Sequence, residues 1–214
     1  WGPDEALRAP GSGDLGKSLA STHSSFETPC GAYGHFKITR YLLRVTGDSS
    51  YGDSMEQVLY NTILGALPLQ PDGTSFYYSD YNNDATKFYH HDKWPCCSGT
   101  LVQTVADYPL NLYFTSADGL YVTLYTPSRA KLIHSGATIQ LEQATSFPVS
   151  DTTTISLTLD RPTTFALYLR LPAWLARPAS LRINDKLMPL NAMSGSFAAI
   201  RRTWRNGDRV DLTL

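Results

Sequence analysis

The chain has 214 residues, of which 42% are hydrophobic and 17% are charged, and its formal net charge at pH 7 is −1. This length is sufficient for one large domain or two small domains with packed hydrophobic cores. A nearly neutral chain without a basic block does not suit nucleic acid or an anionic membrane as a partner, and apolar runs of only a few residues are too short to span a bilayer.

Residues 1–30 are rich in glycine, serine and proline and show no hydrophobic periodicity, which excludes a long helix. Two interpretations remain open: a disordered chain end, or a loop that carries a functional group such as the carboxylate of Glu5. Because the chain begins at Trp1 without an initiator methionine, we expect it to be a piece of a longer protein. Any targeting segment would then lie upstream, so the sequence leaves the compartment open.

Two helices are predicted next. Residues 31–46 are apolar on most of the helical circumference, so we expect a helix that is buried on two sides and ends at Gly47. Residues 51–66 predict a second helix that Pro68 ends, and the two helices would form an αα-hairpin. Its apolar stripe, at helical spacing, consists of Met55, Val58, Leu59, Thr62, Ile63 and Ala66.

Residues 69–95 form a long irregular connection that is rich in aromatic, amide, carboxylate and histidine side chains. A loop of this length in a compact domain is usually functional, and this mixture of ring faces and hydrogen-bonding groups suits a sugar. The alternative is that the aromatic side chains only pack the loop onto the domain. A last helix is predicted from Cys96 to Tyr108, with Leu101, Val102, Val105 and Ala106 as its apolar residues.

From Pro109 onward the hydrophobic period changes from 3.6 to 2, which indicates strands. Large apolar residues at every second position of residues 164–171 predict one face directed into a core and the other directed outward. The predicted strands are Asn111–Thr115, Leu120–Thr126, Ala137–Glu142, Thr154–Leu159, Thr164–Leu171, Ser180–Ile183, Ser196–Thr203 and Arg209–Leu214. We therefore expect a helical domain over residues 1–109 and an antiparallel β-sandwich over residues 110–214.

Three cysteines are an odd number and too few for a disulfide framework, so a thiol or thiolate–metal role fits better. Cys96 and Cys97 are adjacent, and Cys30 follows Glu27 closely. Three thiolates and a carboxylate could complete a tetrahedral zinc site, provided that the backbone bends between the adjacent cysteines. On residue types alone, buried free cysteines and a redox-active pair remain as alternatives.

Seven segments stand out in order along the chain: Glu27–Cys30, residues 46–62, Phe76–Tyr78, Cys96-Cys97, and residues 120–125, 169–174 and 203–208. Together they resemble the β-L-arabinofuranosidase family, glycoside hydrolase family 127, over nearly the whole chain. The resemblance implies the C-terminal part of an (α/α)6 toroid followed by an antiparallel β-sandwich.

The resemblance also implies a retaining glycoside hydrolase that releases β-linked L-arabinofuranose, or a related L-sugar, from plant-type glycans. The family's nucleophile is a zinc-bound cysteine, which would be Cys96, with Glu27 and Cys97 as further zinc ligands. A separate glutamate is the general acid and base; Gly2–Leu7 matches its context, which assigns this role to Glu5. Tyr78 matches a tyrosine on the substrate side.

One departure from the family concerns the spacing of the third cysteine. The family pattern is Glu-x-Cys, whereas Thr28 and Pro29 separate Glu27 from Cys30 here. Either the backbone shifts and Cys30 still binds the metal, or the site has three protein ligands. Because the earlier toroid helices should supply histidines and acids for the sugar, we expect residues 1–214 alone to show no hydrolysis.

Two other functions remain open beside the hydrolase. Residues 110–214 could form a non-catalytic carbohydrate-binding module, or the cysteines could belong to a structural zinc or thiol-redox protein. The expected partner is an arabinose-containing glycan, with a homodimer left open and neither nucleic acid nor membrane expected.

Overall fold

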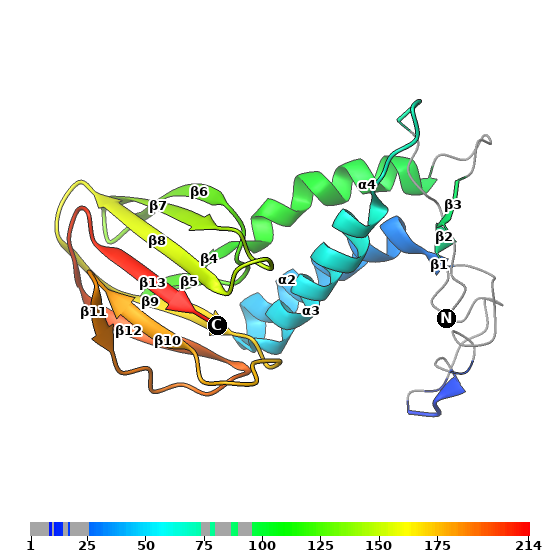
Figure 1. Ribbon diagram of the computed structural model, residues 1–214. Helices are drawn as coiled ribbons and strands as arrows, with labels where there is room; N and C mark the ends of the chain where they lie inside the picture. The colour runs from blue at the N-terminus through cyan, green and yellow to red at the C-terminus, as the bar shows by residue number, and fades with distance from the viewer. Residues whose placement is uncertain are drawn as a thin grey trace. The chain divides into compact units, whose positions relative to one another are not determined.

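The computed structural model describes residues 9, 11–14, 17, 26–73, 78–79, 87–89 and 96–214. The chain divides into two compact units, one formed by Trp1–Ile38 and Gln57–Tyr108 and the other by Thr39–Glu56 and Pro109–Leu214. The long helices precede the two larger β-sheets along the chain (Figure 1), which confirms the expected fold class. None of the described helices is long and apolar enough to cross a membrane.

The three predicted helices are present as α2 (Thr28–Thr46), α3 (Ser50–Val58) and α4 (Cys96–Asp107). α2 begins before the predicted start, since Pro29 fits a first helical turn, where its missing N–H is not needed. The chain after α3 continues as a π-helical turn (Leu59–Ile63) and a 3-10 turn (Leu64–Ala66). The predicted helix 51–66 is therefore helical throughout, but its winding changes along its length.

The apolar stripe predicted for residues 51–66 is buried at four of its positions, Met55, Leu59, Ile63 and Ala66. On α2, the expectation of burial on two sides is wrong for the described structure. One face is buried, with Ala32, Phe36 and Leu43. The other face is exposed, with Ile38, Tyr41, Leu42 and Val45. The apolar circumference of α2 is thus wider than the area that the described residues cover.

Short strands precede α2 and interrupt the connection between residues 69 and 95. They are β1 (Phe26–Glu27), β2 (Tyr78–Ser79) and β3 (Lys87–Phe88), and they form an antiparallel sheet in that order. The register places Glu27 directly opposite Tyr78. The backbone thus brings together two segments that carry residues singled out in the sequence.

The second unit contains two sheets, whose strands Figure 1 labels. The six-stranded sheet has the order β11-β10-β13-β8-β7-β6, and the four-stranded sheet has the order β12-β9-β5-β4. The strands are β4 (Tyr113–Thr115), β5 (Gly119–Val122), β6 (Ser128–His134), β7 (Ala137–Thr145), β8 (Thr152–Leu159), β9 (Thr163–Leu171), β10 (Ser180–Ile183), β11 (Lys186–Met188), β12 (Ser196–Trp204) and β13 (Arg209–Thr213). All pairings are antiparallel except β5 with β9, which is parallel.

Apolar side chains from both sheets form one core, so the sheets are the two layers of a sandwich. On β9, Phe165, Leu167, Leu169 and Leu171 are buried in this core, as their alternation predicts. Within the sandwich, two strands were not predicted, β6 and β11. Each pairs with its neighbour across a two-residue turn with positive φ, at Ser135-Gly136 and Asn184-Asp185.

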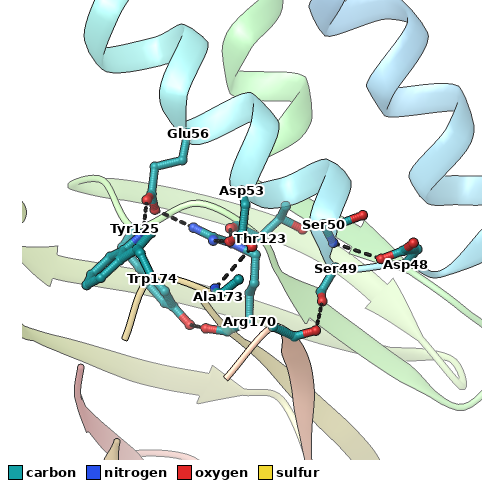
Figure 2. Close-up of polar contacts among 11 residues, drawn as sticks. Asp48, Ser49, Ser50, Asp53, Glu56, Thr123, Tyr125, Arg170, Ala173 and Trp174 are labelled. Carbon is teal, nitrogen blue, oxygen red and sulfur yellow. Dashed lines mark hydrogen bonds and ion pairs between the residues drawn. The ribbon is translucent and has the colours of Figure 1, made fainter. Parts of the chain in front are cut away.

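The other face of β9 does not simply face solvent, because α3 covers part of it. Figure 2 shows the guanidinium of Arg170 donating to the carboxylates of Asp53 and Glu56 on α3. Its Nε donates to the backbone oxygen of Thr123, 2.5 Å away. Arg170 is fully buried, so the expectation that its side chain faces outward was right for the direction and wrong for the exposure. The alternation along a strand cannot show what packs on its second face.

Candidate metal centre

The three cysteines meet in the first unit, where two helices begin. Cys30 lies in the first turn of α2, and Cys96 and Cys97 open α4. The Cys30 Sγ lies 3.2 Å from the Cys96 Sγ and 3.4 Å from the Cys97 Sγ. All three sulfur atoms lie within 4.8 Å of one another. Residues far apart in the sequence thus form one cluster of thiols, at helix ends where negative charge is favoured.

The three thiols fit a single metal ion better than a disulfide. The cysteines are free, and a sulfur–sulfur distance of 3.2 Å is well beyond the bond length of about 2.05 Å in a disulfide. Two thiolates at the corners of a zinc tetrahedron, each about 2.3 Å from the ion, are about 3.8 Å apart. The two separations from the Cys30 Sγ are about 0.4–0.6 Å shorter than that value, so the sulfur atoms need only small shifts to hold one ion. Cys97 is buried and the other two are half-buried, so the cluster is partly screened from solvent.

Two threonines on α4 support the cluster, and sequence reasoning missed them. The Thr100 Oγ1 lies 3.2 Å from the Cys30 Sγ and donates to the backbone oxygen of Cys96 at 2.7 Å. Thr104 is buried and donates to the backbone oxygen of Thr100 at 2.8 Å. Cys96, Thr100 and Thr104 are spaced by four residues, so one helix face carries all three, a spacing that the sequence does show.

The other predicted site residues are placed only in part. Glu27 is the last residue of β1, directly before α2, and Tyr78 pairs with it on β2. The backbone thus places Glu27 one helical turn before Cys30, while the positions of the Glu27 and Tyr78 side chains lie outside what the structure describes. Glu5 lies outside the described residues altogether.

Comparison with known families accounts for nearly the whole chain. Residues 14–110 match the catalytic domain of the β-L-arabinofuranosidases of GH127, and residues 119–214 match the middle domain of the same family. The fold of helices followed by a β-sandwich, with a thiol cluster at the start of α4, is therefore that of a glycosidase family. The chain belongs to glycoside hydrolase family 127, which confirms the resemblance. The expected division of the chain into a helical domain of residues 1–109 and a β-sandwich domain of residues 110–214 stays a prediction.

Solved structures of GH127 proteins are also similar to this chain. A GH127 β-L-arabinofuranosidase from Geobacillus stearothermophilus T6 matches 91% of this chain at 26% identity with a TM-score of 0.76. A structure described as a glycoside hydrolase matches 88% at 26% identity, with a TM-score of 0.75. A GH127 β-arabinofuranosidase at 24% identity and a TM-score of 0.76, again over 88% of this chain, shares the fold. The chain spans 32% of the length of each of these proteins.

Among curated protein sequences, no relative matches this chain significantly.

Proposed function

We propose that this chain contributes the metal centre of a retaining glycoside hydrolase that releases β-linked L-arabinofuranose, or a related L-sugar, from plant-type glycans. The observation that carries the proposal is the cluster of Cys30, Cys96 and Cys97 within 4.8 Å, in a chain that belongs to GH127. A redox-active thiol pair needs no third sulfur at this distance, whereas a zinc ion gathers several ligands around one point.

The proposed ligands are Glu27, Cys30, Cys96 and Cys97, and the proposed metal is zinc. Zinc, when bound, would keep the Cys96 side chain a thiolate at neutral pH. Cys30 has a place in the set despite its unusual spacing from Glu27, since its sulfur lies 3.2 Å from the Cys96 Sγ and 3.4 Å from the Cys97 Sγ. Cys97 is the buried member and would serve as a ligand only, whereas Cys96 is half-buried and so is accessible to a substrate, as Cys30 also is.

The chain's residues would act in two steps. In the first, the Cys96 Sγ attacks the anomeric carbon, the C–S bond forms, and the bond to the leaving oxygen breaks as Glu5 protonates that oxygen. In the second, Glu5 takes a proton from water, water attacks the same carbon, and the C–S bond breaks to return the thiolate. Tyr78, opposite Glu27 in the sheet register, would contact the sugar.

The test combines metal analysis with hydrolysis of p-nitrophenyl β-L-arabinofuranoside, using the longest protein in which this chain occurs naturally. Wild type should bind one zinc ion per chain and hydrolyse the substrate. Cys96→Ser and Glu5→Gln should lose activity by several orders of magnitude, and Cys30→Ser and Cys97→Ser should lose zinc. Ser98→Ala, next to the cluster, is the control and should keep both.

Two results would contradict the proposal. Full activity in Cys96→Ser would show that this cysteine is not the nucleophile. Zinc binding without hydrolysis of any arabinofuranoside would instead favour a structural zinc site, which was one of the alternatives from the sequence.

A further inference from the structure

A group of aromatic side chains lies on the face of the four-stranded sheet that points away from the core. Tyr121 on β5 and Tyr168 on β9 are direct partners in the parallel pairing, and their rings stack at 4.1 Å with an interplanar angle of 6°. Phe197 on β12 contacts the Tyr121 ring edge-on, at 5.2 Å and 86°. Three strands of one sheet therefore hold three half-buried rings in a fixed arrangement, which we call the aromatic platform.

Hydrogen bonds hold the platform in place. The Tyr168 hydroxyl donates to Asp118 Oδ2 at 2.6 Å. The Asp118 carboxylate also accepts a bond from the Ser116 hydroxyl at 2.6 Å, within the turn between β4 and β5. A ring that is already oriented loses little conformational freedom when a ligand binds, so the platform is suited to binding rather than only to packing.

The platform opens into two hollows within the second unit. A shallow hollow of about 320 Å³ is lined by the three rings together with Gly47, Asp48, Ser49, Gly195 and Ser196. A larger hollow of about 670 Å³ shares Gly47 and Tyr121 with it, and its other lining residues include Arg40, Tyr41, Arg44 and Phe114. Both volumes lie within the range of about 300–1,000 Å³ that small-molecule sites occupy. Gly47 and Tyr121 thus line both hollows, which adjoin at these two residues.

The polar groups of the hollows match a sugar better than an apolar ligand. Asp48 is exposed, and hydrogen bonds from Ser50 lower its pKa, so its carboxylate is charged at neutral pH. Its Oδ1 accepts the backbone N–H of Ser50 at 2.9 Å, which leaves lone pairs for sugar hydroxyls. Arg40 and Arg44 supply donors in the larger hollow. Ring surfaces for C–H groups next to charged hydrogen-bonding groups are what a glycan requires.

We propose that the aromatic platform and its two hollows form a second glycan-binding site, in which a linear arabinose-containing oligosaccharide crosses Tyr121 from one hollow to the other. The choice of arabinose rests on the proposed function, whereas the site itself rests on the geometry of the second unit. The site lies in a different unit from the cysteine cluster and shares no residue with it. It would hold a polymeric substrate on the enzyme without taking part in bond cleavage.

The experiment measures binding of a linear trisaccharide of L-arabinofuranose to the Cys96→Ser protein, in which the proposed nucleophile is absent. Isothermal titration gives the affinity, and amide shifts in NMR spectra should change at Gly47–Ser49, Tyr121, Tyr168 and Gly195–Phe197. Adding Tyr168→Leu should weaken binding about tenfold, since it removes an aromatic contact. Tyr168→Phe keeps the ring and should bind within about threefold of the parent, because it loses only the bond to Asp118.

A second pair of variants tests whether the carboxylate of Asp48 contributes to binding. Asp48→Asn should weaken binding about fivefold, the loss of one charge-assisted hydrogen bond. Asp185→Asn is the control and should bind like the parent, because Asp185 is 86% exposed in the β10–β11 turn, where asparagine also accepts its positive φ. Equal melting temperatures across the variants exclude unfolding as the cause.

The outcomes separate this inference from the proposed function. Unchanged binding in Tyr168→Leu, or binding lost on metal removal alone, would overturn the second site and leave the hydrolase proposal intact. Platform-dependent binding in a protein without zinc or hydrolysis would support the site and refute the hydrolase. A dimer that dissociates in Tyr168→Leu and binds no trisaccharide would show that a second copy of the chain occupies the platform, which also overturns the inference.

Discussion

Arg170 places a positive charge in the interior of the second unit, where its side chain is fully buried. Its neighbours compensate the charge: Asp53 and Glu56 accept from its guanidinium, and the Thr123 backbone oxygen accepts from Nε (Figure 2). The Tyr125 hydroxyl donates to the Arg170 backbone oxygen at 2.5 Å. Such a charge is tolerated only while all its partners are present.

We therefore expect Arg170→Met to be strongly destabilising. The substitution leaves two largely buried carboxylates without their cation, which costs about 3–5 kcal/mol of unfolding free energy. Arg129→Met is the matched control: the Arg129 side chain is 80% exposed and pairs with Glu142 at 3.0 Å in solvent, so its loss should change the unfolding free energy far less than the loss of Arg170. Urea unfolding of the two variants measures the difference. Similar losses of unfolding free energy in the two variants would show that the buried ion pairs of Arg170 contribute no more to stability than an exposed pair.

The ionisation of Tyr168 reports mainly on one hydrogen bond, with smaller contributions from burial and from Tyr121. The bond to Asp118 is the main cause that raises the pKa of Tyr168 from 10.0 to about 12. The folded-state pKa lies above the ordinary value, so the bond's contribution to stability is complete below pH 10 and is lost as pH rises to about 12. The pKa of Asp118 is lowered by its bonds from Ser116 and Tyr168, so at the acid end the contribution is present above pH 3.8 and is lost below it.

The Asp118→Ala variant tests this assignment. The pKa of Tyr168 should fall towards 10, and the midpoint of alkaline unfolding should move to lower pH. The measurement is an NMR titration of the tyrosine ring carbons. Tyr125 serves as an internal control, because burial, not Asp118, raises its pKa. If Tyr168 still titrated near pH 12 in the variant, its shift would have another origin.

At the scale of elements, α3 packs so closely on β9 that one glycine is required. A Cβ atom at Gly52 would lie 2.5 Å from the Arg170 Cδ and 3.0 Å from the Thr123 Cγ2. Alanine favours a helix over glycine by about 1 kcal/mol, so helix propensity and packing predict opposite effects at this position. Because the Arg170 side chain is fixed by its ion pairs and cannot move aside, we expect the steric effect to dominate.

The prediction is that Gly52→Ala lowers the unfolding free energy by about 1–3 kcal/mol. Gly34→Ala on α2 is the control, since a Cβ there meets nothing within 4 Å, and it should raise stability by about 0.5–1 kcal/mol. Denaturant unfolding of both variants measures the two changes in unfolding free energy, which should have opposite signs. A stabilising Gly52→Ala would mean that α3 can shift away from the sheet at little cost.

Most elements were predictable because their signals are local. The stripe of residues 51–66 and the alternation on β9 each depend on a few neighbouring side chains. The strand β6 was predictable in principle, from the alternation of Ala130, Leu132 and His134 before the Ser135-Gly136 turn. The parallel pairing of β5 with β9 was not, because sheet order depends on contacts between segments that are distant in sequence.

The candidate site was also predictable only in part. The residue types at Cys30, Cys96 and Cys97 indicate a metal, but their spacing cannot show that two helices begin side by side. Only the fold brings the Cys30 and Cys96 sulfur atoms to 3.2 Å. The aromatic platform has the same origin, because Tyr121 and Tyr168 become neighbours only through the parallel pairing.

At the scale of the whole molecule, the two units should respond differently to zinc. All three clustered sulfur atoms belong to the first unit, so the proposed metal would bind only when the starts of α2 and α4 are folded there. A ligand that binds only the folded state stabilises it by about 2.7 kcal/mol at one hundred times its dissociation constant. The sandwich core of the second unit contains none of the ligands, so its local stability should not depend on zinc.

Hydrogen exchange with and without zinc measures this difference. Amides of α4 from Thr100 to Asp107 should exchange more slowly, by about a hundredfold at one hundred times the dissociation constant, because zinc must leave before the helix opens. Amides of β7, β8 and β13 should exchange at unchanged rates. Cys97→Ser removes the buried ligand and should abolish the protection of α4, whereas Ser98→Ala should preserve it. Equal protection of α4 and the sandwich strands would show that the two units unfold together, because zinc would then stabilise a single cooperative structure.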